Sequence, residues 1–295
     1  MADIVVLGSA NMDLVVRQPR LPEPGETMFG TSFATVPGGK GLNQAIAAAR
    51  VGGDVAFLGA VGDDAFGRQL RETLAAAGVD TDALVDTAHP TGTAHIAVLD
   101  GGENAIVVVP DANGGELGFD DRQRAAIRAA RYLVVQFERP LTLVAEAVAF
   151  ARSAGVTTVV TPAPALPLPE GFLENVDILV PNAAEACSLA GVDDVADAAR
   201  ALSARAGLVV VTRGARGALV ARGGDIVAEV PPHPVTPVDT TGAGDTFTGV
   251  LVARLAAGDA EPEALRAASV AAALATTRPG ASTSMPTWSE VHPHL

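Results

Sequence analysis

Short runs of apolar residues alternate along the chain with longer segments rich in alanine. The apolar runs lie at residues 4–7, 55–58, 132–135, 157–160, 178–180 and 208–211. The alanine-rich segments lie at residues 41–51, 67–77, 121–130, 142–154, 183–189 and 196–206. The short runs are typical of buried parallel strands and the longer segments are typical of helices. Their alternation predicts an α/β fold of three layers, with helices on both faces of a mostly parallel central sheet.

Two stretches depart from this alternation. Residues 12–17 with 27–36, and residues 93–99 with 105–109, are β-rich pieces that have no neighbouring helices. The sequence Asp-Gly-Gly-Glu-Asn at 100–104 is a hairpin-turn signal. We expect these pieces to form a small second sheet that projects from the main body.

This second sheet is expected to act as a lid over a site. Its strands would be inserted at about 12–36 and 92–110 in a single domain that spans residues 1–295. An exposed sheet face favours pairing with a second copy, so a homodimer through the lid is expected. His95 alternates with apolar neighbours in the lid, which favours an outward or interface position for its side chain.

Composition narrows the range of partners. The formal net charge is −14, and a strongly acidic surface repels nucleic acid and anionic lipid, so neither is an expected partner. Cys187 is the only cysteine, which excludes an intrachain disulfide and a cysteine-based zinc site. Residues 1–8 are typical of a strand rather than a signal peptide, and no apolar run is long enough to span a membrane. A cytoplasmic location is therefore expected.

The most informative segment reads Val-Asp-Thr-Thr-Gly-Ala-Gly-Asp-Thr-Phe at 238–247. Gly242, Ala243 and Gly244 would leave main-chain amides open at a helix start, where the helix dipole favours phosphate. Asp245 beside such a nest would suit a base that takes a proton from an attacking hydroxyl. The alternative is that Asp245 only caps the helix.

A second glycine-rich segment, Val-Pro-Gly-Gly-Lys-Gly-Leu-Asn-Gln-Ala at 36–45, leads into a predicted helix. Its glycines allow close approach of a ligand, but their spacing is not that of a Walker A loop. Lys40 in this segment is the only lysine of the chain. Upstream, Asn11 and Asp13 would point to one side of an extended segment and could bind vicinal hydroxyls, or Asn11 could form an Asx turn.

Together the two glycine-rich segments resemble the two signatures of the PfkB/ribokinase family of carbohydrate kinases, and the resemblance extends over essentially the whole chain. It implies a three-layer ribokinase-like fold with a β lid. It also implies that Asp245 is the catalytic base and that the amides of Gly242, Ala243 and Gly244 form its anion hole. The residues that it assigns to the sugar are Asn11, Asp13, Gly38, Gly39, Lys40, Gly41, Asn43 and Glu138.

The same resemblance assigns residues to the nucleotide and to two metal ions. For ATP they are Asn182, Thr212, Arg213, Gly214, Ala215, Arg216, Gly217, Gly244 and Ser269. Glu185 would hold Mg²⁺ through water, although the Asn-x-x-Glu spacing of residues 182–185 also fits a helix capping box. For K⁺ they are Asp239, Thr241, Ala275, Arg278, Gly280 and Ser284.

The resemblance implies an ATP-dependent kinase that converts D-ribose to D-ribose 5-phosphate with Mg²⁺ and K⁺. Same-fold kinases for fructose, 2-keto-3-deoxygluconate, deoxyribose or a nucleoside are alternatives, as is a non-catalytic sugar-binding protein. A nucleoside kinase would need an aromatic platform in the lid, which offers only Phe29 and Phe33. A nucleotide-linked oxidoreductase is disfavoured, because no Gly-x-Gly-x-x-Gly follows the first predicted strand.

Overall fold

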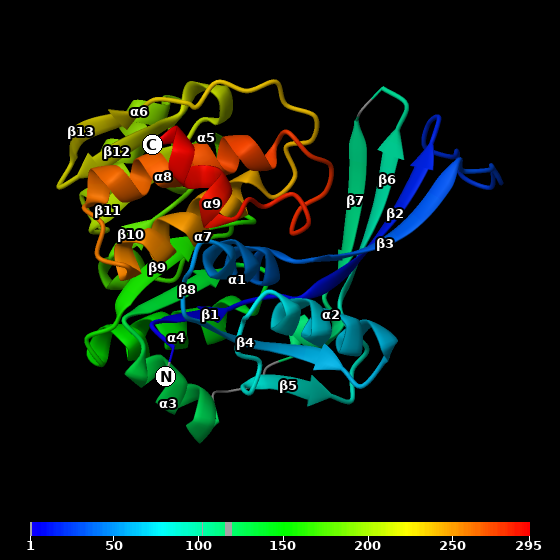
Figure 1. Cartoon of the computed structure of the whole chain (residues 1–295), viewed down its shortest axis with the longest axis horizontal. Helices are drawn as coiled ribbons and strands as arrows, with labels where there is room; N and C mark the ends of the chain where they lie inside the picture. Colours follow the sequence, from blue (N-terminus) through cyan, green and yellow to red (C-terminus); the bar gives the residue numbers. More distant parts are fainter. Residues whose placement is uncertain (1, 102, 116–119) are drawn as a thin grey trace.

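A large, mostly parallel sheet forms the centre of the molecule in the computed structural model, which describes residues 2–101, 103–115 and 120–295 (Figure 1). Within these residues the sheet has nine strands in the order β13-β12-β11-β10-β9-β8-β1-β4-β5. All neighbouring pairs from β11 to β5 are parallel, while β12 and β13 are antiparallel to their neighbours. The strands are β1 (Ile4–Leu7), β4 (Val55–Gly62), β5 (Leu84–Thr87), β8 (Tyr132–Gln136), β9 (Thr157–Thr161), β10 (Ile178–Leu179), β11 (Leu208–Thr212), β12 (Ala218–Arg222) and β13 (Asp225–Val230).

Two hydrophobic cores lie on opposite faces of this sheet, because successive side chains of a strand point to opposite sides. Ile4 and Val6 belong to one core, and Val5 and Leu7 belong to the other. The first core includes α1 (Lys40–Arg50), α2 (Ala65–Ala76), α7 (Ala243–Ala256), α8 (Glu261–Ala275) and α9 (Trp288–Val291). The second includes α3 (Asp121–Ala129), α4 (Leu141–Ser153), α5 (Ala183–Ala190) and α6 (Val195–Ser203). The predicted three-layer arrangement is confirmed.

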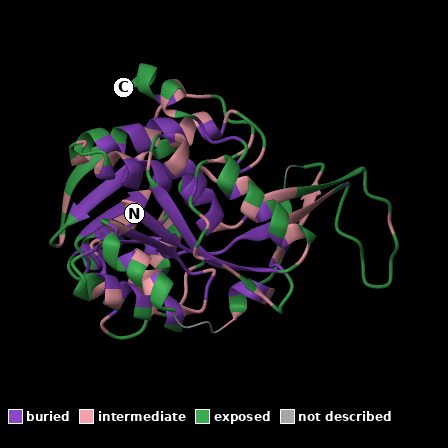
Figure 2. Ribbon diagram, turned by 60° about the horizontal axis from the view of Figure 1, so that its bottom comes forward, coloured by how far each residue is buried: buried purple, intermediate pink, exposed green. Residues whose placement is uncertain are grey.

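A separate four-stranded sheet projects from the body, as the sequence predicts (Figure 1). Its strands are β3 (Ser32–Gly38), β2 (Asn11–Gln18), β6 (Thr93–Leu99) and β7 (Asn104–Val109), in that spatial order. The strand predicted at 27–36 begins later, at Ser32, and the residues before it belong to an exposed loop (Figure 2). The predicted turn at 100–104 connects β6 to β7, but its Gly102 lies outside the described residues. We call this four-stranded sheet the lid.

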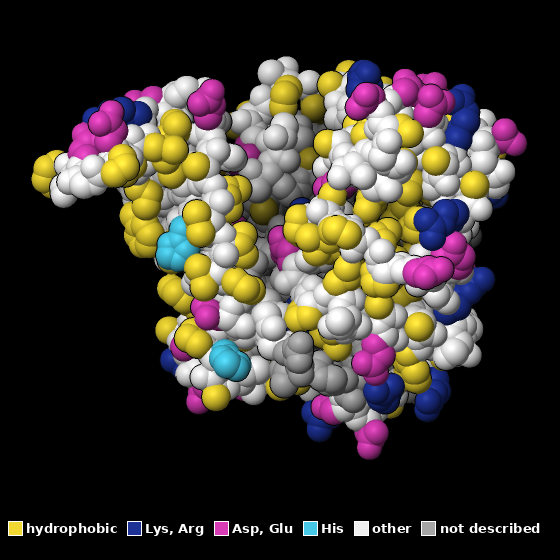
Figure 3. All heavy atoms as spheres, turned by 180° about the vertical axis from the view of Figure 1, so that it is seen from behind, with side chains coloured by type: hydrophobic (Ala, Val, Ile, Leu, Met, Phe, Trp, Pro, Cys, Tyr) yellow, Lys and Arg dark blue, Asp and Glu magenta, His cyan; other side chains and the backbone are white. Residues whose placement is uncertain are grey.

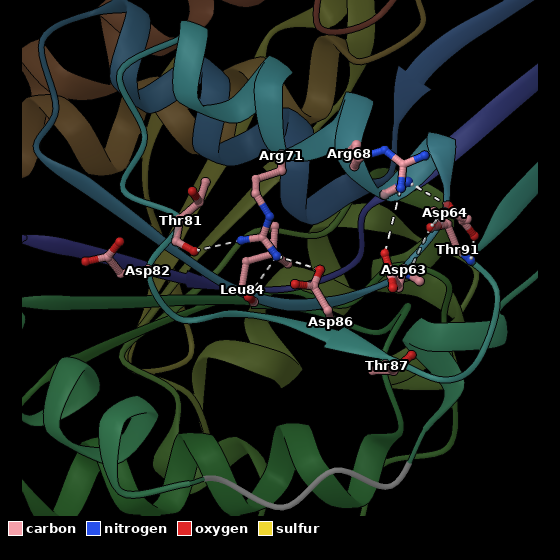
Figure 4. Close-up of polar contacts among 12 residues, drawn as sticks. Asp63, Asp64, Arg68, Arg71, Thr81, Asp82, Leu84, Asp86, Thr87 and Thr91 are labelled. Atoms are coloured by element: carbon pink, nitrogen blue, oxygen red, sulfur yellow. Dashed lines mark hydrogen bonds and ion pairs between the residues drawn. The ribbon is translucent and has the colours of Figure 1, made fainter.

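The base of the lid is tied to the body through Asp64, the N-cap residue of α2 (Figure 4). Its Oδ1 accepts hydrogen bonds from the Gly67 amide and the Thr91 hydroxyl, and its Oδ2 accepts from the Thr91 amide at 2.8 Å. Thr91 precedes β6 and also accepts a hydrogen bond from the Gly62 amide at the end of β4. The start of β6 therefore has a fixed position relative to the central sheet.

Three strands of the central sheet were not expected from the sequence. β5 is a short edge strand with mixed polarity, and Arg71 of α2 holds it by donating to Leu84 O and Asp86 Oδ1 (Figure 4). β12 and β13 form a hairpin whose connecting Gly223 and Gly224 both have positive φ angles, 61° and 91°. A turn of two glycines is itself a hairpin signal. The two strands were nevertheless not predicted, because strands were expected only where apolar residues form a continuous run.

The predicted helices occur within a few residues of their expected positions, and several begin at a side-chain cap, such as Asp64 before α2 and Asp194 before α6. Within the described parts of the chain, none of the helices has the length and apolar character needed to cross a membrane.

Candidate active site

The site lies where the first turns of α1 and α7 come together beyond the carboxyl end of β1. Gly41 of α1 lies directly on Gly8, and Gly249 of α7 lies on the backbone of α1, close to Gln44 O. Because these glycines lack a Cβ atom, the helices approach each other and the sheet closely. Asp245, one helical turn before Gly249, is thereby brought beside Asn43 and Gln44.

Asp245 is buried, with 7% of its surface exposed. Its Oδ2 accepts a hydrogen bond from Asn43 Nδ2 at 3.1 Å, and its Oδ1 accepts one from Gln44 Nε2 at 3.0 Å. Burial raises the pKa of Asp245 above its ordinary value, while the Lys40 ammonium and the two amide donors oppose this rise. A carboxylate that is ionised but has an elevated pKa is suited to accept a proton.

Lys40, which begins α1, is the nearest source of positive charge. The Asp245 carboxylate raises the pKa of Lys40, burial opposes the increase, and Glu138 and Glu185 add to it. Glu138 follows β8, and its Oε2 accepts hydrogen bonds from Ser9 Oγ at 2.5 Å and from the Lys40 amide at 3.0 Å. The structure thus brings segments from β1, β8, α1, α5 and α7 to one site around a single ammonium group.

The glycine-rich start of α7 has the backbone geometry of an anion site. Gly242 is the N-cap residue and has a left-handed conformation, with φ at 74°. The Ala243 amide donates to Thr240 O at 3.3 Å, so this amide is partly used in the turn. For the amides of Gly242 and Gly244, the described residues provide no hydrogen-bond acceptor. Main-chain amides without an acceptor at a helix start are the kind of donor that can bind an anion.

On the sugar side predicted from the sequence, Asn11 and Asp13 lie in β2 near the base of the lid. Gly38 pairs with Asn11, and a Cβ atom at Gly38 would lie 2.3 Å from Asp13 Oδ2. The side chain of Asn113, in the turn after β7, donates from Nδ2 to Asn11 Oδ1 at 2.8 Å and to Ala10 O at 3.0 Å. Asn113 therefore fixes the orientation of the Asn11 amide: the Asn11 oxygen faces Asn113, and the Asn11 NH₂ group points away from it.

Asp13 has an unusual titration for a carboxyl group. Burial and the nearby Glu138 carboxylate raise the pKa of Asp13 from 3.8 to about 7. Between these values the folded protein retains a proton that the unfolded chain has released. The contribution of Asp13 to the free energy of unfolding therefore falls as the pH rises from about 4 to 7, and it is constant above that window.

Asp13→Asn is expected to stabilise the ligand-free protein at pH 8, because it replaces a poorly solvated carboxylate with a neutral group of the same shape. On the sugar-binding role that the family resemblance implies for Asp13, the same change should raise KM for the sugar roughly tenfold, since a charged hydrogen-bond acceptor is lost. Thermal unfolding from pH 4 to pH 8, together with KM measurements, tests both effects. The exposed Asp225→Asn is the control. An unchanged or lowered melting temperature at pH 8 would contradict the expectation.

Asn182, assigned to the nucleotide, and Glu185, assigned to Mg²⁺, lie at the start of α5. Asn182 and Glu185 form the capping box that was considered as an alternative, with the Glu185 amide donating to Asn182 Oδ1 and the Asn182 amide donating to Glu185 Oε2. Burial raises the pKa of Glu185, and Lys40 opposes the rise, which places Glu185 within electrostatic range of the site. The backbone of Asn182 also forms an isolated parallel β-bridge with Thr212, the last residue of β11. The capping box formed by Asn182 and Glu185 is therefore compatible with the ligand-binding roles that the resemblance implies for them.

The loop after β11 contains the short helix η3 (Gly214–Arg216), followed by Gly217 at φ 73°. A Cβ atom at Gly217 would lie 1.9 Å from Val230 O. Ser269 of α8 donates to Pro231 O at 3.0 Å. The segment after β13 therefore lies between the loop and Ser269, and the Ser269 hydroxyl already has a protein partner.

Of the residues assigned to K⁺, Thr241 and Gly280 contact the Asp239 carboxylate. Its Oδ1 accepts from the Thr241 amide and hydroxyl, and its Oδ2 accepts from the Gly280 amide at 2.8 Å. The Asp239 amide donates to Thr276 O, next to Ala275. Ser284 is buried and bonds to Ala281 O, whereas Arg278 is exposed and pairs with Glu290. The Asp239 carboxylate therefore links Thr241 to the Gly280 segment.

Gln44, Gln136 and Asn113 were not expected to be part of the site, although Gln44 lies in the segment 36–45 and Gln136 lies two residues before Glu138. Gln44 and Gln136 are completely buried, and Asn113 is 1% exposed. Arg139, also buried, donates to Ala112 O and so supports the turn that carries Asn113, and burial lowers the pKa of Arg139 to about 10. The sequence signal for Asn113 was only that of a turn.

The structure combines a three-layer α/β fold, a β lid and an aspartate at the glycine-rich start of a helix. These features together are typical of one family of kinases. The chain belongs to the pfkB family of carbohydrate kinases, whose family model matches residues 1–288.

Within this family the chain is similar to ribokinases. It is 41% identical over 299 residues to the ribokinase of Bacillus subtilis, a match that covers 99% of this chain and 98% of that enzyme. It is 39% identical over 296 residues to the ribokinase of Haemophilus influenzae, covering 97% of this chain and 96% of that enzyme. The solved structure of Arabidopsis thaliana ribokinase complexed with ribose and ATP has a TM-score of 0.91 and 32% identity, and the match covers 99% of this chain and 98% of that chain.

Proposed function

We propose that this protein is an ATP-dependent sugar kinase that phosphorylates D-ribose to D-ribose 5-phosphate. The observation that carries the proposal is the position of Asp245. This buried carboxylate is held by Asn43 and Gln44 beside the open amides at the start of α7. The relatives in Bacillus subtilis and Haemophilus influenzae are ribokinases, and the related Arabidopsis thaliana structure holds ribose and ATP.

In the proposed mechanism, Asp245 accepts the proton of the attacking sugar hydroxyl. The elevated pKa that burial gives Asp245 favours this transfer, and the Lys40 ammonium opposes the rise and so favours the ionised form. The amides of Gly242, Ala243 and Gly244 would stabilise the negative charge of the transferring phosphoryl group. The lid would exclude water, which otherwise competes as an acceptor.

The sugar would be held between the lid and α1. The groups assigned to it are those of Asn11, Asp13, Gly38, Gly39, Lys40, Gly41, Asn43 and Glu138. Asn43 Oδ1 is buried without a hydrogen-bond partner among the described residues, and a sugar hydroxyl that donates to this oxygen would remove the cost of its burial. A hollow between the lid and the body is visible in Figure 3, and the sugar would enter there.

The nucleotide would lie across the loop after β11, on Asn182, on residues 212–217 and near Ser269. Mg²⁺ commonly retains several waters and takes one or two carboxylates in addition to phosphate oxygens, which fits Glu185 as a partner through water. The ion would supply neutralisation of phosphate charge. K⁺ would bind the loop organised by Asp239, with Thr241, Ala275, Arg278, Gly280 and Ser284 contributing mainly main-chain carbonyls.

The lid would also form the interface of a homodimer. Several apolar side chains on its strands and on the loop between β2 and β3 are exposed: Phe29, Phe33, Ile106, Val107, Val108 and Val109. Figure 3 shows hydrophobic side chains over this projecting part of the molecule. His95 is exposed on the same sheet. We further propose that residues 1–295 act as a single domain and that the enzyme works in the cytoplasm, where ATP is supplied.

An ADP-release assay across acceptors tests the proposed function. D-ribose is expected to give the highest kcat/KM in a panel that also contains fructose, 2-keto-3-deoxygluconate, deoxyribose and nucleosides. Each acceptor is measured with and without K⁺, and K⁺ is expected to increase the rate. A higher kcat/KM with another acceptor would reassign the substrate, and the absence of ADP release with every acceptor would contradict the kinase function.

A further inference from the structure

A buried glutamine lies directly behind the proposed base. Gln44 is the fifth residue of α1, and none of its surface is exposed. Its Nε2 donates to Asp245 Oδ1 at 3.0 Å, while Asn43 donates to the other oxygen. Because it has no accessible surface, Gln44 can affect a bound sugar or nucleotide only through its neighbours.

The orientation of the Gln44 amide is fixed from the opposite side. Gln136, the last residue of β8, donates from Nε2 to Gln44 Oε1 at 2.7 Å. An oxygen that accepts from Gln136 leaves the Gln44 NH₂ group pointing at Asp245, so Gln44 has to be a donor there. The reversed amide would place two oxygens together at the base, which is unfavourable in a buried site.

The same NH₂ group has a second, longer contact. Gln44 Nε2 lies 3.3 Å from Thr161 Oγ1, which in turn lies 3.3 Å from Thr248 Oγ1 of α7. The network therefore joins β8, β9, α1 and α7 around one carboxylate. Since all its members are buried, water cannot replace a donor that is removed.

We propose that Gln44 is a positioning residue for the base, which keeps the Asp245 carboxylate ionised and oriented through a hydrogen bond whose direction is set by Gln136. This inference rests on the proposed function, because it concerns the same proton transfer. The charged groups that face Asp245 are Lys40 of α1, Glu138 after β8 and, around Lys40, Glu185 of α5. In addition to these charged groups, Gln44 acts on Asp245 as a neutral hydrogen-bond donor.

The test is the pH dependence of kcat/KM for Gln44→Met, which retains the side-chain length but has no donor. Loss of a donor to the charged form raises the pKa of Asp245, so the acidic limb should move up by about one pH unit or more. At pH values below the limb, kcat/KM should fall about tenfold, while activity at high pH and KM for ATP change little. Gln123→Met, at a buried glutamine that caps the distant helix α3, is the matched control.

A folded Gln44→Met protein with the wild-type acidic limb would overturn the inference, even if its activity were uniformly reduced. Should this variant not fold, Gln136→Met decides, because it leaves Gln44 in place but removes the group that orients its amide. A limb that moves upward supports the inference, and an unchanged limb contradicts it. The pH profile is recorded with the best acceptor of the panel, so failure of D-ribose as a substrate and failure of this inference give different results.

Discussion

Asp245→Asn is expected to lower kcat by roughly 10²–10⁴-fold while the protein remains folded. The asparagine cannot accept the proton of the attacking hydroxyl. It would also place an NH₂ group against Asn43 Nδ2 or Gln44 Nε2, each of which donates to an oxygen of Asp245. Loss of a buried negative charge partly offsets this unfavourable contact, because burial already disfavours the ionised form.

Steady-state kinetics and ATP binding measured by calorimetry separate the possible causes. ATP affinity should change much less than kcat, since Asp245 is proposed to act on the sugar hydroxyl. Asp225→Asn makes the same chemical change at an exposed position of β13 and should have wild-type kinetics. Turnover close to that of the wild type in Asp245→Asn would remove this residue from the mechanism.

The two glycine-rich motifs could be recognised from the sequence because their chemistry is local. Gly242 requires a left-handed conformation, and the helix that follows has its acidic residue in the first turn. The strands were equally accessible, since β1 and β8 are continuous apolar runs with both faces buried. Roles for individual residues, in contrast, came from the resemblance to a family and not from the pattern itself.

Contacts between distant segments could not be read from the sequence. Asn43 and Asp245 are separated by 202 positions, and Asn11 and Asn113 by 102. Polar residues such as Gln44 and Gln136 resemble surface residues in a pattern of apolar positions. Only the folded chain shows that Gln136 donates to Gln44, while Gln136 Oε1 is buried without a partner among the described residues. The short edge strand β5 was missed because its burial depends on a neighbouring strand and on Arg71.

Gly41→Ala is expected to reduce kcat/KM for the sugar by about 10²-fold, because a displacement of about 1 Å in catalytic groups can have this effect. A Cβ atom at position 41 would lie 2.6 Å from Gly8 Cα, 2.7 Å from Ser9 N and 2.8 Å from Gly8 C. These are backbone atoms of the segment after β1, and no side-chain rotation can relieve the overlap. Helix α1 must therefore move away, together with Lys40, Asn43 and Gln44.

Helix propensity alone predicts the opposite effect on stability, since alanine is favoured over glycine in a helix by about 1 kcal/mol. Overpacking against backbone costs about 1–3 kcal/mol or more, so the melting temperature should fall. Gly101→Ala is the control, because a Cβ atom there meets no atom within 4 Å. A Gly41→Ala protein with a higher melting temperature and normal kcat/KM would show that the contact between α1 and the end of β1 does not set the positions of Asn43 and Gln44 at the base.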